Sequence, residues 1–435
     1  MSHVFGRTGA DAPRIASGRG AELWDTTGKR YLDAAGGAIV VGVGHGEHEV
    51  LKAQAEQAAR VAYTHGSMFR SDVLEKYADE LAAVLPVDDP RVYPVSGGSE
   101  AVETALKMAR AYHLARGEDR HVVVARTGAY HGNTRGALDA TGRASLRGPY
   151  LPWLGATVRT GTPYEYRCPF PATHPVGCGT RHAAALADLC REQPVAAFIA
   201  EPIAGAALGA CVPPADYWPA IAQVCRRYGV LLIADEVMTG FGRTGAWFGV
   251  DHWGVRPDIL VAAKGAASGY WPLGLAVAAG HVHDTIAGTG FTHGFTYSHH
   301  AVGAATGLAV LRVLRDRGLV PAARASGDLL REALGAELIR SPFAGDIRGR
   351  GLLVGVELVA DRGTKRPFPR RERVAERVSA AAQEAGLLLY TGTGCADGTD
   401  GDLILLGPPL IVSSDEIAEI AAGTAEAIRA VLDPI

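Results

Sequence analysis

The stretch ADYWPAIAQVCRRYGVLLIADEVMTGFGRTG, residues 215–245, joins a helix-like segment directly to an apolar run of strand length. Residues 215–229 space their apolar side chains as an amphipathic helix does, and residues 230–236 are apolar until they end in two acids. A helix followed at once by a fully apolar strand is typical of a parallel sheet that is wrapped by crossover helices. This pairing predicts an α/β fold.

The same alternation continues on both sides of this stretch. Further strands are predicted over residues 121–126, 195–201 and 258–263, and a long helix over residues 99–116. After Val320 the pattern changes to helices alternating with short strands. The clearest of these strands covers residues 351–359, and a helix-like segment ends the chain. The sequence therefore predicts a large domain with a mostly parallel sheet and a smaller α+β domain.

The N-terminal segment carries two short strands around a turn, AELWDTTGKRYLDAAGG, which we expect to join the small domain. We predict that residues 1–55 form this joining segment. Residues 56–320 would then form the large domain and residues 321–435 the small one. A chain of 435 residues is long enough to bury a sizeable core in this arrangement.

Composition narrows the function classes. The formal charge of −3 comes from well-mixed acids and bases, so we expect no nucleic-acid partner. The longest apolar runs have strand length, so we expect no membrane span, and the N-terminus shows no signal-peptide core, which favours the cytoplasm. Six cysteines make no disulfide framework; Cys168 and Cys178 are either a metal pair or two ordinary thiols.

Two polar motifs follow predicted strands at the edge where open α/β sheets bind ligands. SGGSEAVETALK, residues 96–107, is a glycine-rich turn that runs into a helix, and it is either a phosphate site or a plain helix cap. Asp235 ends a wholly apolar strand. Its carboxylate needs a cation or donor opposite it, which could be a salt bridge or the protonated nitrogen of a pyridine ring.

Two further motifs complete the pattern. GAYHGNT, residues 128–134, places an aromatic side chain after a strand, either as packing or as a platform for a flat ring. Lys264 follows the next apolar strand, 29 residues after Asp235, where burial would lower its pKa and make it a nucleophilic amine. Phosphate turn, carboxylate, flat side chain and amine together fit pyridoxal 5'-phosphate, with Lys264 forming the Schiff base.

With these residues identified, the chain resembles the class III pyridoxal-phosphate-dependent aminotransferases, the ω-aminotransferase branch of the fold-type I enzymes. The resemblance covers nearly the whole chain. It rests on GAELWDTTGKRYLD, VGVGHGEHEV, SGGSEAVETALK, AYHGNT, AEPIAGA, ADEVMTGFGRTG, PDILVAAKGAASGYWPLG, THGFTYSHH and GPPLIVS. It implies a homodimer, with residues 56–320 binding the cofactor and active sites at the subunit interface.

The resemblance also implies roles around the cofactor ring. Lys264 would hold the cofactor covalently and move protons, and Asp235 would pair with the ring nitrogen. Tyr130 would stack on one face of the ring and Val237 on the other, with His131 contacting the cofactor from the same motif as Tyr130.

Four more positions carry roles in the family. Gly98 and Ser99 would take the phosphate, and Thr296 would reach the phosphate bound in the partner subunit. Glu201 would lie close to the ring and orient it.

Departures from the family pattern bear on the substrate. Several members use a glutamate and an arginine as a gate for an α-carboxylate; the matching positions here are Ala206 and Leu405, and residues 390–402 hold no arginine. A donor whose reacting carbon bears no carboxylate is therefore expected. Arg70 and Arg126 are the candidate cations for the keto acid.

The predicted reaction moves an amino group from a primary amine or ω-amino acid to a keto acid such as pyruvate. The alternative within the fold is a racemase or aminomutase, which returns the amine to the same molecule. Two alternatives come from other functional classes. GVGHG at residues 42–46 suggests a dinucleotide-binding protein, although its spacing departs from the dinucleotide-binding fingerprint. The other alternative is a catalytically silent regulator that binds the cofactor.

Overall fold

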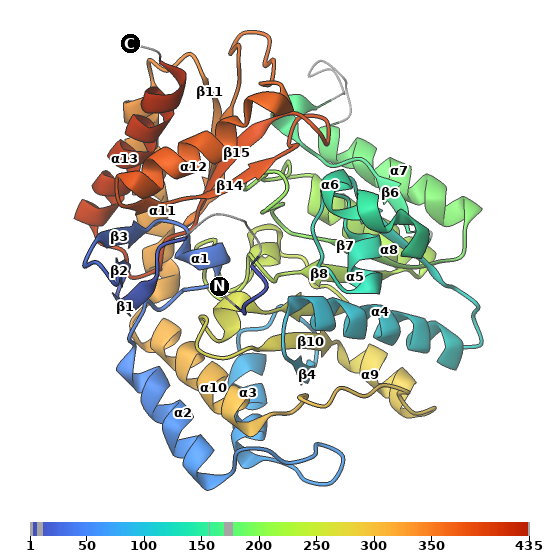
Figure 1. The fold of residues 1–435 in the computed structure, drawn as a ribbon. Coiled ribbons are helices and arrows are strands. Elements are labelled where there is room, and N and C mark those ends of the chain that lie inside the picture. Colours follow the sequence, from blue (N-terminus) through green and yellow to red (C-terminus); the bar gives the residue numbers. More distant parts are fainter. Residues whose placement is uncertain (1–2, 7–11, 156, 169–176, 434–435) are drawn as a thin grey trace.

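The computed structural model describes residues 3–6, 12–155, 157–168 and 177–433 (Figure 1). Most of the loop between Cys168 and Cys178 therefore lies outside the described residues. The strands are β1 (Ile15–Arg19), β2 (Glu22–Asp25), β3 (Arg30–Asp33), β4 (Arg91–Val95), β5 (Val122–Arg126), β6 (Val158–Thr160), β7 (Val195–Ala200), β8 (Leu231–Asp235), β9 (Ile259–Ala262), β10 (Gly274–Ala278), β11 (Ala344–Arg350), β12 (Leu353–Leu358), β13 (Leu387–Leu388), β14 (Tyr390–Thr393) and β15 (Asp402–Leu406).

The α-helices range from single turns to segments of 20 residues. They are α1 (Gly36–Ile39), α2 (His48–Arg60), α3 (Asp72–Ala82), α4 (Gly98–Ala115), α5 (Arg135–Ala140), α6 (Ala144–Arg147), α7 (Cys178–Glu192), α8 (Tyr217–Tyr228), α9 (Gly280–Ala287), α10 (Ala301–Asp316), α11 (Leu319–Leu338), α12 (Val374–Glu384) and α13 (Ser414–Leu432). Short 3₁₀ turns cover Gly148–Trp153, Glu165–Arg167, Gly249–Trp253, Lys264–Ala266 and Arg370–Glu372.

A seven-stranded sheet in the order β4-β10-β9-β8-β7-β5-β6 forms the centre of the molecule. Its neighbours from β9 to β6 are parallel, whereas β10 runs antiparallel to both β9 and β4. The predicted α/β fold with a mostly parallel sheet is therefore confirmed. Pro94 lies in the edge strand β4, where a missing N–H is tolerated.

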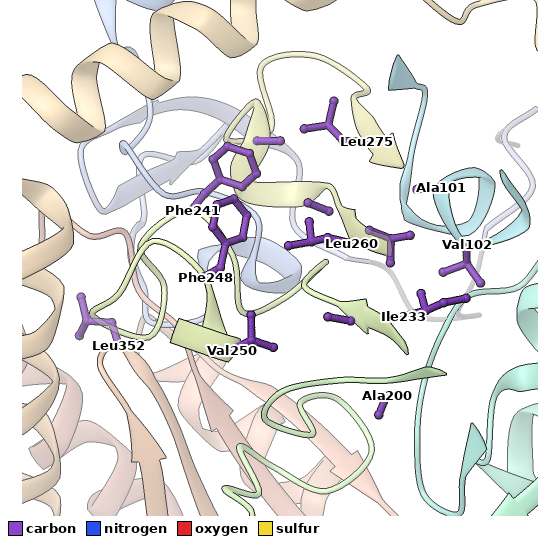
Figure 2. Packing of buried hydrophobic residues seen from close by; sticks show 14 of the residues in the cluster. Ala101, Val102, Ala200, Ile233, Phe241, Phe248, Val250, Leu260, Leu275 and Leu352 are labelled. Carbon is purple, nitrogen blue, oxygen red and sulfur yellow. The ribbon is translucent and has the colours of Figure 1, made fainter. Parts of the chain in front are cut away.

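The core of this sheet is almost wholly apolar. Every residue of β7, β8, β9 and β10 is buried, which explains why their sequences are continuous apolar runs. Figure 2 shows Ile233 and Leu260 of the sheet close to Val102 of α4. The rings of Phe241 and Phe248 pack edge to face with centroids 5.5 Å apart.

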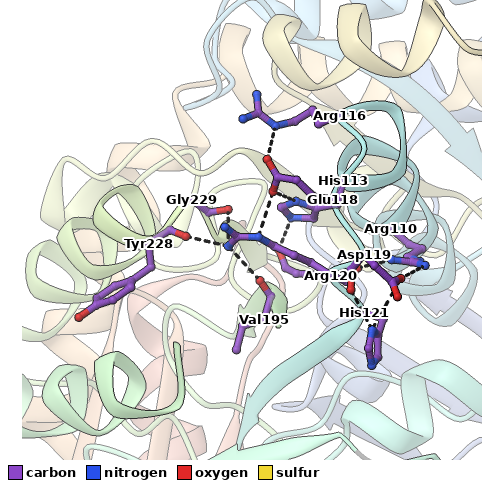
Figure 3. A network of polar contacts seen from close by, with 11 residues as sticks. Arg110, His113, Arg116, Glu118, Asp119, Arg120, His121, Val195, Tyr228 and Gly229 are labelled. Atoms are coloured by element: carbon purple, nitrogen blue, oxygen red, sulfur yellow. Dashed lines mark hydrogen bonds and ion pairs between the residues drawn. The ribbon is translucent and has the colours of Figure 1, made fainter. Parts of the chain in front are cut away.

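A polar network fixes the amino ends of the central strands (Figure 3). His113 of α4 donates from Nε2 to the carbonyl of Ala196 at 2.9 Å, and Arg120 donates to the carbonyl of Tyr228 at 2.7 Å, just before β8. Glu118 links the two through contacts of 3.2 Å to His113 and 3.0 Å to Arg120. The carboxyl ends of the strands, on the opposite edge, are left for ligand contacts.

Two four-stranded sheets are built from the outer parts of the chain, in the orders β1-β2-β3-β13 and β11-β12-β15-β14. In the first, β13 runs parallel to β3, so that Leu387 is paired with Leu32. Figure 1 shows α11, α12 and α13 gathered beside β11, β14 and β15. A capping box between Ser413 and Glu416 starts α13, as the sequence SSDE predicts.

Candidate active site

Loops at the carboxyl edge of the central sheet surround one cavity of about 380 Å³, which we call the inner cavity. Asp235 ends β8, Glu201 follows β7 and Lys264 comes two residues after β9, so sheet topology brings the three together. The inner cavity is lined by Val40, Ser96, Gly97, Gly98, Ser99, Tyr130, His131, Gly132, Glu201, Ala206, Asp235, Val237, Met238, Ala263, Lys264, Gly269, Trp271, Pro272 and Leu273.

Asp235 is held by two donors. Its Oδ2 lies 2.6 Å from Nδ1 of His131, and its Oδ1 accepts from the backbone N–H of Val237 at 3.1 Å. The backbone N–H of His131 donates to Thr141 Oγ1 at 2.9 Å and so fixes the ring. Among the described residues, Nε2 of His131 is buried without a hydrogen-bond partner. The Asp235 carboxylate is therefore fixed at the cavity wall, next to the ring whose Nε2 has no partner among the described residues.

Lys264 has an unusual backbone and an unusual environment. Its φ of 45° lies in the left-handed region, which costs a lysine of the order of 1 kcal/mol or more, and such strain gathers at functional sites. Burial lowers the pKa of the Lys264 ammonium to about 8, although Asp235 and Glu201 pull it upwards. A lysine with this pKa has a substantial neutral fraction near neutral pH.

The first turn of α4 forms the end of the inner cavity that suits an anion. Gly97 and Gly98 precede Ser99, and the first N–H groups of a helix have no acceptor within it. A Cβ on Gly98 would lie 3.0 Å from a methyl group of Val237, so any other residue here would have to displace the Val237 side chain. Ser99 Oγ exchanges hydrogen bonds of 3.1 Å with Asn133.

Glu201 lines the inner cavity and also holds two loops together, the one with Tyr130 and the one with Gly205. Its two carboxylate oxygens accept from the backbone N–H groups of Tyr130 at 3.1 Å and Gly205 at 2.9 Å. The pKa of this carboxyl is raised by burial. Arg126 donates to the Glu201 carbonyl at 2.6 Å and lies over the Tyr217 ring, so its guanidinium is used in packing.

A second space of about 730 Å³, the outer cavity, adjoins the inner one and shares Tyr130, Gly132, Ala206 and Lys264 with it. Its remaining lining is Ala38, Asn133, Arg135, Leu138, Arg143, Leu146, Tyr150, Trp153, Leu154 and Tyr390. The two cavities together could accommodate a cofactor and a substrate that meet at Lys264.

Comparison with known proteins identifies the family. The family profile described as Aminotransferase class-III matches residues 9–428. The chain is a class III aminotransferase. It is 35% identical over 423 residues to an uncharacterized aminotransferase, YodT, of Bacillus subtilis (strain 168), covering 96% of this chain and 95% of the relative. It is 34% identical to the diaminobutyrate–2-oxoglutarate transaminase of Halomonas elongata, covering 100% and 94% of the two chains.

Solved structures of transaminases have the same fold as this chain. This aminotransferase superposes on an (S)-enantioselective ω-transaminase from Thermomicrobium roseum with a TM-score of 0.90 and 36% identity, covering 99% of this chain and 97% of that one. It superposes on the ω-transaminase of Pseudomonas jessenii in complex with PMP with a TM-score of 0.92 and 31% identity, covering 99% and 97%. The class III transaminase fold, fold type I, is thereby confirmed.

The aminotransferase brings together all but one of the residues predicted to contact the cofactor. Gly98, Ser99, Tyr130, His131, Glu201, Asp235, Val237 and Lys264 all line the inner cavity, where their individual roles remain predictions. Thr296 does not line it: its side chain is exposed, and its carbonyl accepts from the Tyr63 hydroxyl at 2.8 Å. Sequence reasoning did not single out Val40, which directly precedes the VGVGHGEHEV motif, or Trp271, which lies within the Lys264 motif, because an apolar side chain in a loop gives no chemical signal of its own.

Two candidate cations for the keto acid lie elsewhere. Arg126 is buried against Tyr217, and Arg70 is exposed and paired with Glu75 at 3.0 Å; neither lines the inner or the outer cavity. Of the two gate positions, Ala206 borders both cavities, and Leu405 is buried in β15.

The structure also shows where the GVGHG motif and the Cys168–Cys178 pair lie. GVGHG forms a loop whose Gly42 N–H donates to Ser268 Oγ at 2.7 Å and whose Gly44 carbonyl accepts from Tyr270, so this loop braces the site. Sγ atoms of Cys168 and Cys178 lie 2.9 Å apart. Within the described ranges, no group of three or more His, Cys, Asp or Glu could hold a metal ion, and no helix is long and apolar enough to cross a membrane.

Proposed function

We propose that the aminotransferase binds pyridoxal 5'-phosphate in the inner cavity and transfers an amino group from a primary amine or ω-amino acid to a keto acid such as pyruvate. The observation that carries this proposal is the joint presence in one cavity of Lys264, with a pKa of about 8, and of Asp235, bonded to His131. The first turn of α4 adds a phosphate-sized cradle of glycines to the same cavity.

The residues present fit this cofactor. Gly98 and Ser99 would hold the phosphate at the helix N-terminus, and Asp235 would hold the ring nitrogen. Tyr130 and Val237 would cover the two ring faces, and Lys264 would be the covalent attachment point. When bound, pyridoxal phosphate supplies an electron-withdrawing ring that stabilises negative charge on the substrate carbon.

The side chains of the protein would supply position and protons. Asp235 is pre-oriented by His131 and Val237, so its Oδ1 needs little reorganisation to hold a proton at a pyridine nitrogen. Lys264 Nζ would move a proton to and from the substrate carbon, since an amine with a pKa of about 8 can both accept and donate near neutral pH. Glu201 would keep the Tyr130 loop in place.

We also propose that the working unit is a homodimer in which Thr296 reaches the partner's phosphate site. Large apolar side chains are exposed close to Thr296 in the sequence and in space, among them Tyr63 and Tyr297, whose rings are 6.2 Å apart. A second copy of the chain would cover them. Residues 56–320 would form the cofactor domain, with residues 1–55 and 321–435 forming the small domain.

The proposal is tested with a donor amine labelled with ¹⁵N and unlabelled pyruvate. A transaminase places the label in alanine and releases an equal amount of carbonyl product from the donor. The alternative, a racemase or aminomutase, leaves the label in the donor molecule or its isomer. Label that never reaches alanine or another supplied keto acid would contradict the proposed reaction.

A further inference from the structure

Two arginines, Arg135 and Arg143, line the outer cavity, and they differ in whether the folded chain gives them a hydrogen-bond partner. Arg135 donates from Nε to the carbonyl of Trp153 at 2.6 Å. Arg143, which comes directly before α6, has a buried Nε without a hydrogen-bond partner among the described residues. Arg143 also takes part in none of the ion pairs between described residues. Its guanidinium is thus a cation of the cavity wall that the folded chain leaves to be paired.

The neighbouring Arg147 and Arg159 also have a buried Nε without a hydrogen-bond partner among the described residues, but their guanidiniums are paired through other nitrogens. Arg147, at the other end of α6, pairs with Asp139 at 3.6 Å, and Arg159 donates to the carbonyl of Thr141 at 3.1 Å. Arg143 lines the cavity, whereas Arg147 and Arg159 do not.

Among the described residues, the lining of the outer cavity contains no carboxylate to balance the charge. Arg143 is half-buried, and burying its Nε without a partner is costly, while the planar fork of N–H donors of a guanidinium matches a carboxylate. The rest of the wall is largely apolar, with Leu138, Tyr150, Trp153 and Tyr390 among its members. A ligand suited to this space carries an anionic end for Arg143 and an apolar body.

We infer that Arg143 binds the distal carboxylate of the substrate, so that the preferred donors are ω-amino acids whose amine and carboxylate are separated by an apolar chain. The amine would meet Lys264, which lines both cavities, while the carboxylate pairs with Arg143. This inference rests on the proposed function. It gives Arg143 a role in binding the donor, separate from the keto-acid role for which the sequence offered Arg70 and Arg126.

The test compares 6-aminohexanoate with hexylamine, two donors that differ only in the distal carboxylate, using purified holoenzyme and pyruvate. Arg143→Met should lower kcat/KM for 6-aminohexanoate by about 30-fold or more, the scale of losing one partner of a desolvated charge pair, and change it less than about threefold for hexylamine. Arg143→Lys should restore part of the loss. Arg147→Met, the same change at the last residue of α6 and outside the outer cavity, should leave the ratio of the two donors unaltered.

A binding measurement separates this inference from the proposed reaction. Hexanoate, which has no amine, should bind the wild-type holoenzyme and bind Arg143→Met at least about tenfold more weakly by calorimetry. Equal losses for both donors in Arg143→Met, or unchanged hexanoate affinity, would overturn the role of Arg143. If the wild type transaminates neither donor while hexanoate binding still depends on Arg143, the anion site stands and the proposed function fails.

Discussion

Nδ1 of His131 lies 2.6 Å from Oδ2 of Asp235, and both side chains are shielded from water. One carboxylate oxygen is thereby occupied by the imidazole, while Oδ1 accepts, among the described residues, only the N–H of Val237. A carboxylate oxygen has two lone pairs, so Oδ1 retains the capacity to accept a further proton donor from the cavity. The pair can therefore accept a proton donor from the cavity without moving, as the proposed contact with the ring nitrogen requires.

Asp235→Asn should weaken pyridoxal-phosphate binding and slow the half-reaction with amine by roughly 10²-fold or more, because a neutral amide does not stabilise a protonated nitrogen. Cofactor affinity and single-turnover absorbance changes measure the two effects. Asp258→Asn is the matched control. Asp258 comes directly before β9, accepts from the backbone N–H of Leu232 in β8 and lies outside both cavities. A normal half-reaction in Asp235→Asn would remove Asp235 from the chemistry.

Lys264→Ala should retain the fold, bind the cofactor without covalent attachment and lose turnover by several orders of magnitude, since nucleophile and proton carrier are removed together. Borohydride treatment of the wild-type holoenzyme followed by peptide mapping should find the cofactor on Lys264. Lys107→Ala, a change on the exposed face of α4, should behave as the wild type. Cofactor mapped to another lysine would show that the attachment point is wrong.

The lowered pKa of Lys264 has a consequence for the stability of the cofactor-free protein. Its folded-state pKa of about 8 lies below the ordinary value of 10.5, so between these values the unfolded chain binds more protons. Stability linked to this group therefore rises with pH across that window. Lys264→Met, which cannot titrate, should be more stable than the wild type at pH 7, by about 3 kcal/mol from 1.36 kcal/mol per pKa unit.

Urea unfolding of the two cofactor-free proteins at a series of pH values measures this difference. The advantage of Lys264→Met should shrink as the pH rises from 8 towards 10.5. A difference that stays constant across that window would show that the Lys264 ammonium is not destabilised by its surroundings.

Glu201→Gln should lower the free energy of unfolding by about 1 to 3 kcal/mol, because an amide offers one acceptor oxygen where the carboxylate offers two. Either Tyr130 or Gly205 would then keep an unpaired buried N–H. Cofactor affinity should fall as the Tyr130 loop loosens. Denaturant unfolding and cofactor titration test both statements, and an unchanged affinity would detach Glu201 from the position of Tyr130.

Thr296→Ala should weaken cofactor binding by about 1 to 2 kcal/mol, the scale of one hydrogen bond to a charged group. Mixing it with Lys264→Ala should restore activity in hybrid dimers, because one of the two sites then carries both residues intact. Thr292→Ala, an exposed neighbour, should bind cofactor normally. Proven subunit exchange without recovered activity would count against a contact across the interface.

Much of the fold could be predicted because the central strands are continuous apolar runs. Residues 230–236 and 258–263 correspond to β8 and β9 within a residue or two at each end. The sequence did not predict β10, because three of the five residues of Gly274–Ala278 are glycine or alanine, which have weak strand preference. The pairing of β13 with β3 joins positions over 350 residues apart, and no local pattern indicates it.

The site could be predicted in its residues but not in its shape. Polar motifs at strand ends converge because parallel strands share one edge, which is why Asp235 and Lys264 meet. Arg143 gave no signal, since an arginine before a short helix is usually a solvated surface charge. Its significance appears only from the absence of a hydrogen-bond partner for its Nε within the described part of the chain and from the cavity that it lines.

The pairing of β3 with β13 also determines when the active site can come into being. Ala38, just after β3, and Tyr390, which starts β14, both border the outer cavity, so its walls come from both ends of the chain. A chain emerging from the ribosome folds from its N-terminus and lacks residue 390 until synthesis is nearly finished. The outer cavity is thus completed only after nearly the whole chain has been made, and a product truncated before residue 390 could not possess it.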